Sequence, residues 1–342
     1  MELSIIIINW NSKGYLRSCL DSILEYTSNI EYEIIIVDSG SFDGCGEMLR
    51  EFYPKVHFIQ SDCNMGFARS NNLGAGCSKG KVLLFLNPDT EMRGSAITNL
   101  YRRFQSLSNP GVVGCRLLNS DGSLQTSCVQ PLPTVMNQIL DVDLFQRWFP
   151  KVGLWTNGAT FGNGTDPVEV EALSGACLMI QRKVFEQVGG FSTDYFMYGE
   201  DLDLCYKTRK AGFRNFYVPD IAIVHHGGGS SKNSRSDFSN IMMRESVSRF
   251  LSKYRGNWYQ KCYRLGLAVT STARLMLLAL FFPIWLRRGR SHEWIRAFWK
   301  WTGILRWGIG LEKWIQNYDR LGTTSVGPYG NKGKKCAGSA EN

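Results

Sequence analysis

The sequence has no apolar run long enough to cross a bilayer. Its most apolar segment, Leu265–Leu286, contains Arg274 and Pro283, and the uninterrupted part from Leu275 onward has only twelve residues. A membrane-spanning helix needs roughly 20. The first residues, MELSIIIINWNS, also lack a basic region followed by a small-residue cleavage site. We therefore expect neither a transmembrane helix nor a secretory signal peptide.

The sequence also lacks the cysteine patterns of disulfide-rich and zinc-binding domains. Its ten cysteines are scattered, with no C-x-x-C pair, and several fall in apolar or helix-like segments, among them Cys19, Cys77, Cys177 and Cys205. A free cysteine in such a place behaves as a small hydrophobic side chain. We therefore expect a reducing, cytosolic setting.

What the sequence does have is an uneven distribution of charge. The net charge is +9, but residues 251–342 carry 16 Lys and Arg against 4 Asp and Glu, which leaves 23 basic and 26 acidic residues in 1–250. The same tail holds seven of the ten tryptophans. A chain of 342 residues is long enough for one large domain and an appendage, and these two parts are predicted to face different surroundings.

The first 90 residues alternate between buried strands and helices. LSIIIINW is a continuous apolar run of strand length, and similar runs follow at Ile34–Val37 and Val82–Leu86. Apolar residues recur at a helical period between them, as in Tyr15–Leu24. Continuous apolar strands separated by helices indicate a mostly parallel α/β sheet covered on both faces. Residues 110–170 show weak periodicity and are predicted to be irregular, with a few strands.

Polar side chains follow three of the predicted strands at the point where each strand ends. They are Asn9, Asp38 and Asp89. Ligands of open α/β sheets bind beyond the carboxyl ends of the strands. We therefore expect these three side chains to converge on one crevice.

Six motifs, in their order and spacing, resemble those of the family 2 glycosyltransferases. They are VDSGSFDG, NMGFARSNN, LNPDT, SGACLMIQRKVFEQVGGF, FMYGEDLDLCYKTRKAGF and VHHGGGSS, and the resemblance covers about residues 1–255. The similarity is strongest to a bacterial branch that resembles rhamnosyltransferases of O-antigen and cell-wall assembly. The resemblance implies a GT-A fold, with a Rossmann-like sheet between helices. It also implies an inverting mechanism, a nucleotide-sugar donor and a divalent cation, Mg²⁺ or Mn²⁺.

The segment Asn87-Pro88-Asp89 resembles the D-x-D metal element of the family, with asparagine in place of the first acid. A cation that bridges two phosphates neutralises the charge developing on a leaving nucleoside diphosphate, and oxygen ligands suit Mg²⁺ or Mn²⁺. Asp89 is then a direct ligand, while Asn87 contributes a carbonyl oxygen or orders a water. The alternative is a helix cap or a turn, because N-P-D-T is favourable turn chemistry.

Further residues match the positions at which the family binds its nucleotide. In the family, the acid of VD accepts a hydrogen bond from the imide nitrogen of uracil or thymine, and a carboxylate suits that donor. Ser39 and Phe42 depart from the usual asparagine and from the usual serine or threonine. The alternatives are an Asx-turn for the acid and a solvated helix face for the residues of GFARSNN. The predicted nucleotide-binding residues are Asn9, Asn11, Asp38, Arg69, Asn72 and Asn87.

A second acidic pair, Glu200-Asp201, matches the catalytic position of the family. The acceptor hydroxyl must lose its proton as it attacks the anomeric carbon, and a carboxylate opposite the leaving group can take that proton. The resemblance assigns the base to Asp201 and an orienting role to Glu200. The alternative is an ordinary helix start, where the macrodipole favours Asp and Glu.

The doublet His225-His226 precedes a glycine run and supplies two of the four histidines of the chain. A histidine opposite Asp89 can complete the shell of the metal, and glycines allow the backbone to approach a diphosphate closely. The family position favours His225 as the ligand, with His226 as the alternative. A structural histidine is the other interpretation. Gly175 resembles the family position whose backbone lines the acceptor side of the site.

The basic tail is predicted to associate with a membrane surface. It mixes tryptophans with Arg and Lys at helical spacing beside a short apolar segment, and indole rings favour the headgroup level while cations favour anionic lipid. A solvated basic face or a nucleic-acid site is the alternative. The expected organisation is a catalytic domain at 1–250, a basic amphipathic helical region at 251–322 and a disordered tail at 323–342.

Together these features predict a glycosyltransferase that lies peripherally on the cytoplasmic face of the membrane. We expect it to move a sugar, L-rhamnose from dTDP-rhamnose as the first choice, onto a lipid-linked glycan. A transferase that uses a UDP-hexose or UDP-N-acetylhexosamine is the alternative within the class. A catalytically silent, membrane-bound protein that binds nucleotide sugars is the alternative outside it. No nucleic-acid partner is predicted.

Overall fold

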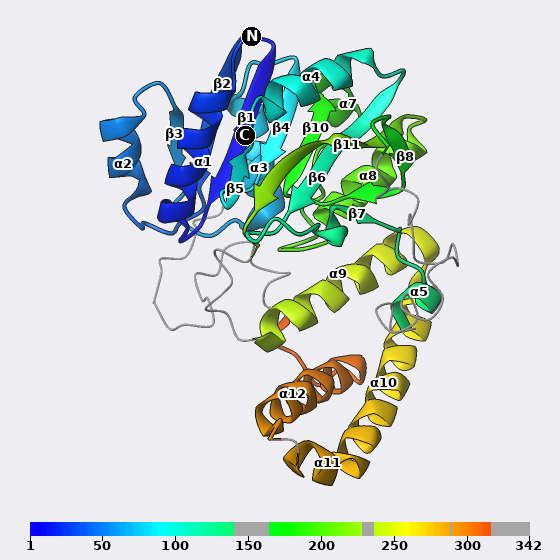
Figure 1. The fold of residues 1–342 in the computed structure, drawn as a ribbon. Helices are drawn as coiled ribbons and strands as arrows, with labels where there is room; N and C mark the ends of the chain where they lie inside the picture. The colour runs from blue at the N-terminus through cyan, green and yellow to red at the C-terminus, as the bar shows by residue number, and fades with distance from the viewer. Residues whose placement is uncertain (140–163, 228–235, 288, 316–342) are drawn as a thin grey trace.

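The computed structural model describes residues 1–139, 164–227, 236–287 and 289–315. An α/β domain stands above a lobe of helices in the view of Figure 1. The predicted tail at 323–342 lies outside the described residues, and so do residues 316–322 of the predicted helical region and 140–163 of the segment predicted to be irregular.

The amino-terminal part of the α/β domain alternates strands and helices as the sequence predicts. Its isoleucine-rich strands have no polar alternation, because both of their faces are buried. β1 pairs in parallel with β2 and with β4, so that Asn9 lies opposite Asp38 at the carboxyl ends. The elements are β1 (Leu3–Asn9), α1 (Lys13–Tyr26), β2 (Tyr32–Asp38), α2 (Cys45–Phe52), β3 (His57–Gln60), α3 (Gly66–Cys77) and β4 (Val82–Leu86).

The rest of the domain extends this sheet with strands of both directions. The main sheet has the order β3-β2-β1-β4-β10-β6-β11-β5, with β8 paired to β11, and helices cover both faces (Figure 1). β10 is antiparallel to β4 and β6, while β11 is parallel to β6. The elements are β5 (Thr90–Met92), α4 (Ala96–Ser106), β6 (Pro110–Leu118), the 3₁₀ helix η1 (Thr126–Cys128), β7 (Val129–Gln130), α5 (Val135–Ile139), β8 (Val168–Val170), β9 (Ala172–Leu173), β10 (Cys177–Gln181), α7 (Arg182–Gln187), α8 (Glu200–Lys210) and β11 (Arg214–His225).

The pairing of β11 brings distant segments to one edge of the sheet. Its last residue, His225, lies opposite Thr90 of β5, and Val224 lies opposite Leu118 at the end of β6. The carboxyl ends of β6 and β11 therefore lie next to the turn that follows β4. This mixed, mostly parallel architecture is the one that the sequence predicts.

The helical lobe has a core of its own. It consists of α9 (Ser236–Arg255), α10 (Asn257–Leu280), α11 (Phe282–Arg287) and α12 (Ser291–Gly308). Gly256, at φ +93°, separates α9 from α10. The core is formed by Ile241, Val247, Leu251, Tyr263, Leu267, Ile304, Trp307 and Ile315. The predicted domain boundary at residue 250 falls inside α9, because the apolar face of this helix packs against α10 and α12.

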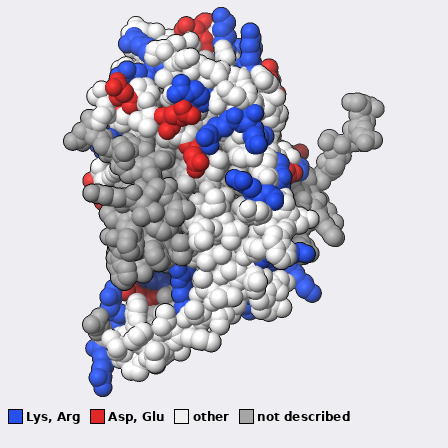
Figure 2. Space-filling view, turned by 90° about the vertical axis from the view of Figure 1, so that its right-hand side faces the viewer, with Lys and Arg blue, Asp and Glu red and all other residues white. Residues whose placement is uncertain are grey.

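The outer surface of the lobe is unusually apolar. Five large side chains on one face of α10 are between 61% and 74% exposed, at a spacing that places them in a single stripe: Trp258, Leu265, Val269, Met276 and Leu280. The lobe shows a broad uncharged surface in Figure 2, with Lys and Arg at its margins. Within the described part of the chain, no helix has both the length and the apolar character to cross a membrane.

Candidate active site

One cavity of about 410 Å³ lies beyond the carboxyl ends of the strands. Asn87 and Asp89 line it from the turn after β4, His225 from the end of β11, and Glu200 and Asp201 from the start of α8. The backbone at residues 175–176 connects the two groups, since Ala176 accepts a hydrogen bond from the amide of Asn87 and Gly175 donates one to Asp201. The residues predicted for the metal and for the base therefore share one space.

The first group in this cavity is a cluster of Asp89, His225 and Asn87. His225 Nε2 lies 3.3 Å from Asp89 Oδ1 and 3.3 Å from the Asn87 amide nitrogen. Two ligands bound side by side to a divalent cation at roughly 2.1 Å are about 3 Å apart, so the Asp89–His225 spacing fits a shared cation. The side chains present can thus hold a metal without rearrangement of the backbone.

The two histidines of the doublet point in different directions. His226 Nε2 lies 3.0 Å from Glu91 Oε1, and its Nδ1 lies 2.8 Å from the Ser120 hydroxyl. The backbone amide of His226 donates a hydrogen bond to the Asp89 carbonyl oxygen at 2.9 Å. Neighbouring residues of a strand project to opposite faces, and here this rule places His225 beside the Asp89 carboxylate and His226 away from it.

The second group in the cavity is the acidic pair at the start of α8. Asp201 accepts hydrogen bonds from the Gly175 amide at 2.9 Å and from its neighbour Leu202 at 2.8 Å. Glu200 is 6% exposed, and its Oε2 has no hydrogen-bond partner among the described residues. Burial raises the pKa of both carboxyls, and together with the Asp201 charge it raises the pKa of Glu200 to about 8. At neutral pH, Glu200 therefore holds a proton, while the hydrogen bonds from the Gly175 and Leu202 amides favour the charged form of Asp201.

Asn9 and Asp38 lie side by side, as predicted, but neither lines the cavity. Both side chains are fully buried, with Asn9 Nδ2 3.5 Å from Asp38 Oδ1. Asp38 accepts hydrogen bonds from Ser41, from the Phe42 amide and from the exposed side chain of Gln60. A nucleobase that binds Asp38 must therefore first displace the side-chain amide of Gln60.

Three predicted nucleotide contacts are not brought to the cavity. Arg69 and Asn11 are exposed outside it, with Asn11 at φ +51°. Asn72 uses both ends of its amide to hold the backbone of Phe191, at 2.8 and 2.9 Å. The geometry gives Asn72 a structural contact between α3 and the loop before α8.

Asp43, the second acid of VDSGSFDG, lies beside Asn9 and was not singled out from the sequence. Asp43 binds the Asn9 amide at 3.2 Å and accepts hydrogen bonds from the backbone of Lys13 and Cys45. Asp38, Asp43 and Cys45 also place three ligand atoms within reach of one ion. Burial raises the pKa of the Cys45 thiol, however, and both carboxylates already have several donors. The contacts of this cluster therefore hold the segment after β2 in place.

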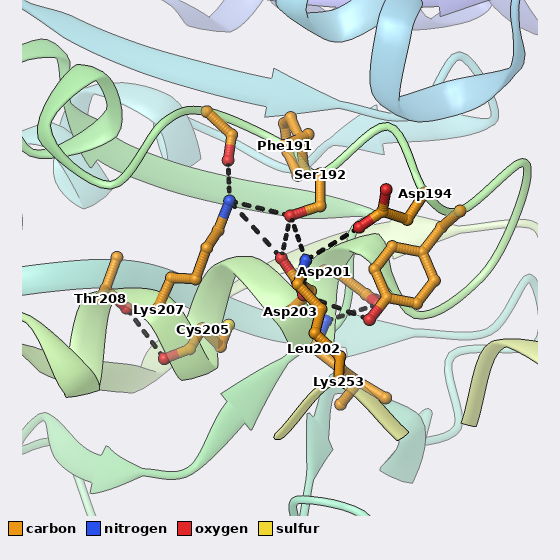
Figure 3. Close-up of polar contacts among 12 residues, drawn as sticks. Phe191, Ser192, Asp194, Asp201, Leu202, Asp203, Cys205, Lys207, Thr208 and Lys253 are labelled. Carbon is orange, nitrogen blue, oxygen red and sulfur yellow. Dashed lines mark hydrogen bonds and ion pairs between the residues drawn. The ribbon is translucent and has the colours of Figure 1, made fainter. Parts of the chain in front are cut away.

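A second omission is Asp203, two residues beyond the pair, which is fully buried. Its carboxylate contacts Ser192, Tyr254, Lys207 and Lys253 (Figure 3). Burial disfavours the charge, but these hydrogen bonds and cations outweigh it and lower the pKa of Asp203. Two of the partners belong to α9, so this acid fastens the helical lobe to the helix that carries the pair.

The helical lobe also contributes directly to the cavity. Met243, Ser246 and Val247 of α9 line it, and the Ser246 hydroxyl donates a hydrogen bond to Met197 at 3.0 Å. No pattern in the sequence indicates these contacts, because contacts between α9 and the cavity depend on how the two units dock.

Comparison with known proteins agrees with this geometry. The model of the family described as "Glycosyl transferase family 2" matches residues 4–189, more than half of the chain. The chain belongs to glycosyltransferase family 2. A second model, described as "N-terminal domain of galactosyltransferase", matches residues 165–227 of this glycosyltransferase.

Curated relatives of the glycosyltransferase include several rhamnosyltransferases. It is 27% identical over 305 residues to an N-acetylglucosaminyl-diphospho-decaprenol L-rhamnosyltransferase of Mycobacterium tuberculosis, covering 85% of this chain and 96% of the relative. It is 24% identical to the rhamnosyltransferase WbbL of Escherichia coli K12, covering 73% of this chain and 93% of the relative. A Haloferax volcanii hexosyltransferase, Agl10, is 30% identical over 66% of this chain and 67% of its own length.

Solved structures share the fold of the glycosyltransferase. A mannosyltransferase from Pyrobaculum calidifontis, in complex with GDP-Man and Mn²⁺, superposes with a TM-score of 0.55 at 16% identity, covering 91% of this chain and 86% of its own. GalNAc-T7 with UDP, GalNAc and Mn²⁺ superposes with a TM-score of 0.51 at 18% identity, covering 66% of this chain and 44% of its own. The mixed, mostly parallel α/β fold is thus of the GT-A type.

Proposed function

We propose that the protein is an inverting, metal-dependent glycosyltransferase that moves L-rhamnose from dTDP-rhamnose onto a lipid-linked glycan. The observation that carries this proposal is the single cavity lined both by the Asp89–His225 cluster and by the Glu200–Asp201 pair. A cation held by Asp89 and His225 would neutralise the departing nucleoside diphosphate. A carboxylate with one imidazole favours Mn²⁺ over Mg²⁺, which prefers oxygen ligands alone.

The transfer step follows from the ionisation of the pair. Asp201, whose charged form is favoured by its two backbone donors, accepts the proton of the acceptor hydroxyl as its oxygen attacks the anomeric carbon. The bond from this carbon to the phosphate oxygen breaks on the opposite face, so the configuration at the carbon inverts. Glu200, which holds a proton, adds no second negative charge beside Asp201. Both oxygens of Asp201 keep a free lone pair for this work beside their backbone donors.

The donor is tested by a screen of nucleotide sugars. We expect dTDP-rhamnose with Mn²⁺ to raise the melting temperature and to be turned over, since a ligand that binds only the folded state stabilises it, by about 2.7 kcal/mol at 100 times its Kd. EDTA should abolish product-nucleotide release. Turnover of a UDP-hexose in preference to dTDP-rhamnose would favour the alternative donor class. Binding without turnover of any donor, with a lipid-linked acceptor present, would favour a silent binding protein.

We further propose that the helical lobe rests on an anionic membrane through the apolar stripe of α10. The stripe is exposed, and the segment that contains it carries a large excess of basic residues. Apolar side chains that enter the headgroup region, with cations around them, are the features of an interfacial helix. Names of relatives that act on decaprenol-linked substrates agree with this location.

Replacing Leu265 and Met276 together by glutamate is expected to abolish sedimentation with phosphatidylglycerol vesicles, because two carboxylates would enter the interface. Both side chains are 67% exposed, so the fold should tolerate the change. The control replaces Leu24 and Phe52 of the α/β domain, which are 51% and 50% exposed, by glutamate. Equal sedimentation of the α10 variant and the control would refute the proposal that the stripe binds the membrane. Truncation near residue 255 is unsuitable, because it would uncover Val247 and Leu251.

A further inference from the structure

A chain of hydrogen bonds leads from an exposed aspartate to the candidate metal ligand. The Ser123 hydroxyl donates to Asp121 at 2.6 Å, the Asn119 amide donates to the Ser123 oxygen at 2.9 Å, and the Gln125 amide donates to Asn119 Oδ1 at 3.0 Å. The last link joins Gln125 Oε1 to His225 Nδ1, at 2.7 Å. The three intermediate residues lie outside the six motifs of the sequence analysis, and none of them was predicted to have a function.

The first residue of this chain fixes the direction of every bond in it. An ionised carboxylate only accepts, so the Ser123 hydroxyl must donate to Asp121, and its oxygen is free to accept from the Asn119 amide group. The carbonyl oxygen of Asn119 then faces the amide group of Gln125, which leaves the carbonyl oxygen of Gln125 for the histidine. The hydrogen bonds from Ser123 lower the pKa of Asp121, so its carboxylate is ionised at neutral pH.

The consequence for the imidazole is a defined tautomer. A carbonyl oxygen at Nδ1 requires a proton there, so the lone pair of the neutral ring is on Nε2. Nε2 is the nitrogen that lies 3.3 Å from Asp89 Oδ1 and accepts a hydrogen bond from the side-chain amide of Asn87. A metal ligand needs this lone pair, and a hydrogen bond at the other ring nitrogen is the usual means of orienting it.

The backbone holds Gln125 rigidly enough for this purpose. The amide of Asn119 donates to the Ser123 carbonyl at 2.8 Å, and the amide of Gln125 donates to Leu117 at 2.9 Å. These bonds close a turn directly after β6. Because β6 lies beside β11 in parallel, with Leu118 opposite Val224, the turn is held next to His225.

We propose that Gln125 is a positioning residue that fixes the tautomer and orientation of His225 and thereby sets the affinity of the Asp89–His225 site for a divalent cation. This inference rests on the proposed function, since it requires that this pair binds the metal. It adds a residue whose side chain touches neither the metal nor the substrate.

The test measures Mn²⁺ affinity directly, from the electron paramagnetic resonance signal of free Mn²⁺ in the presence of dTDP. Gln125→Ala is expected to weaken Mn²⁺ binding by about 10- to 100-fold, the range found when the orienting partner of a metal-bound histidine is removed. Gln125→Glu keeps an acceptor at the same place and should restore most of the affinity. Asn119→Ala, which removes the partner of Gln125 and leaves Gln125 itself in place, should give a smaller loss. Gln187→Ala, an exposed residue on α7, is the matched control.

Nitrogen NMR of the imidazole rings provides a readout that a merely structural role would not move. At a pH where its ring is neutral, His225 of the metal-free protein should carry its proton on Nδ1, and Gln125→Ala should convert it to a mixture of tautomers while its melting temperature stays that of the control. Unchanged Mn²⁺ affinity in Gln125→Ala, with a clear loss in His225→Ala, would overturn this inference alone. Unchanged affinity in His225→Ala would overturn the metal site of the proposed function as well.

Discussion

Replacing Asp201 by asparagine is expected to lower kcat by about 10²- to 10⁴-fold, the contribution of a general base, while the donor still binds. The amide keeps the shape of the side chain, but its one oxygen can accept from Gly175 or from Leu202 and not from both, because the NH₂ group that replaces the second oxygen only donates. The main loss is the ability to take a proton. The measurement is single-turnover transfer, together with donor affinity from the thermal shift with dTDP-rhamnose and Mn²⁺.

Two variants frame this result. Glu200→Gln imitates the protonated carboxyl that the raised pKa of Glu200 implies, so it should lose much less activity at pH 7 than Asp201→Asn. Glu186→Gln neutralises an exposed acid on α7 and should behave as the unchanged protein. A larger loss in Glu200→Gln than in Asp201→Asn would assign the base to the other member of the pair.

Replacing Asp203 by alanine is expected to destabilise the protein by roughly 3 kcal/mol, because breaking a buried ion pair leaves uncompensated charges. Lys207 and Lys253 would then face each other without the carboxylate that separates them. In a chain of this size, such a loss lowers the melting temperature by about 6–12 °C. Thermal unfolding followed by circular dichroism measures it.

The pH dependence of stability gives this prediction a second readout. The pKa of Asp203 is lowered in the folded protein, so its contribution to stability is present above the unfolded value, near 3.8, and is lost as the pH falls through the lower folded value. The alanine variant should not show this loss of stability at low pH. Asp194→Ala removes a mostly exposed partner of Lys253 and should lower the free energy of unfolding by less than about 1 kcal/mol. An equal melting temperature for both variants would contradict the role of Asp203 as the link between α8 and α9.

The parts of the fold that local sequence determines were predictable. The isoleucine runs of β1 and β2 specify buried parallel strands, and polar residues at the ends of such strands must meet at one edge of the sheet. The pair Glu200–Asp201 at a helix start was equally visible, because acids favour that position and the glycine before it, at φ +86°, ends the preceding loop.

The parts that depend on packing between distant segments were not. The orientation of His225 comes from the pairing of β11 with β5 and from a glutamine 100 positions earlier in the chain. Residues of α9 line the cavity, and α9 belongs to the lobe from Ser236 onward. Both facts depend on the packing of apolar faces, and the change of composition near residue 250 does not reveal that packing. Asn72 belongs to the family motif NMGFARSNN, yet its side-chain amide is hydrogen-bonded to the backbone of Phe191.

The central claim is that a cation-bound diphosphate and a proton acceptor share the cavity beyond the strand ends. A crystal of the protein with dTDP and Mn²⁺, with the anomalous signal of manganese measured, tests this most directly. The account predicts an anomalous peak roughly 2.0–2.3 Å from the Asp89 carboxylate and from His225 Nε2, with both phosphates on it and Asp201 facing the space left by the sugar. A peak at Asp38, Asp43 and Cys45, or a nucleotide bound outside this cavity, would contradict it.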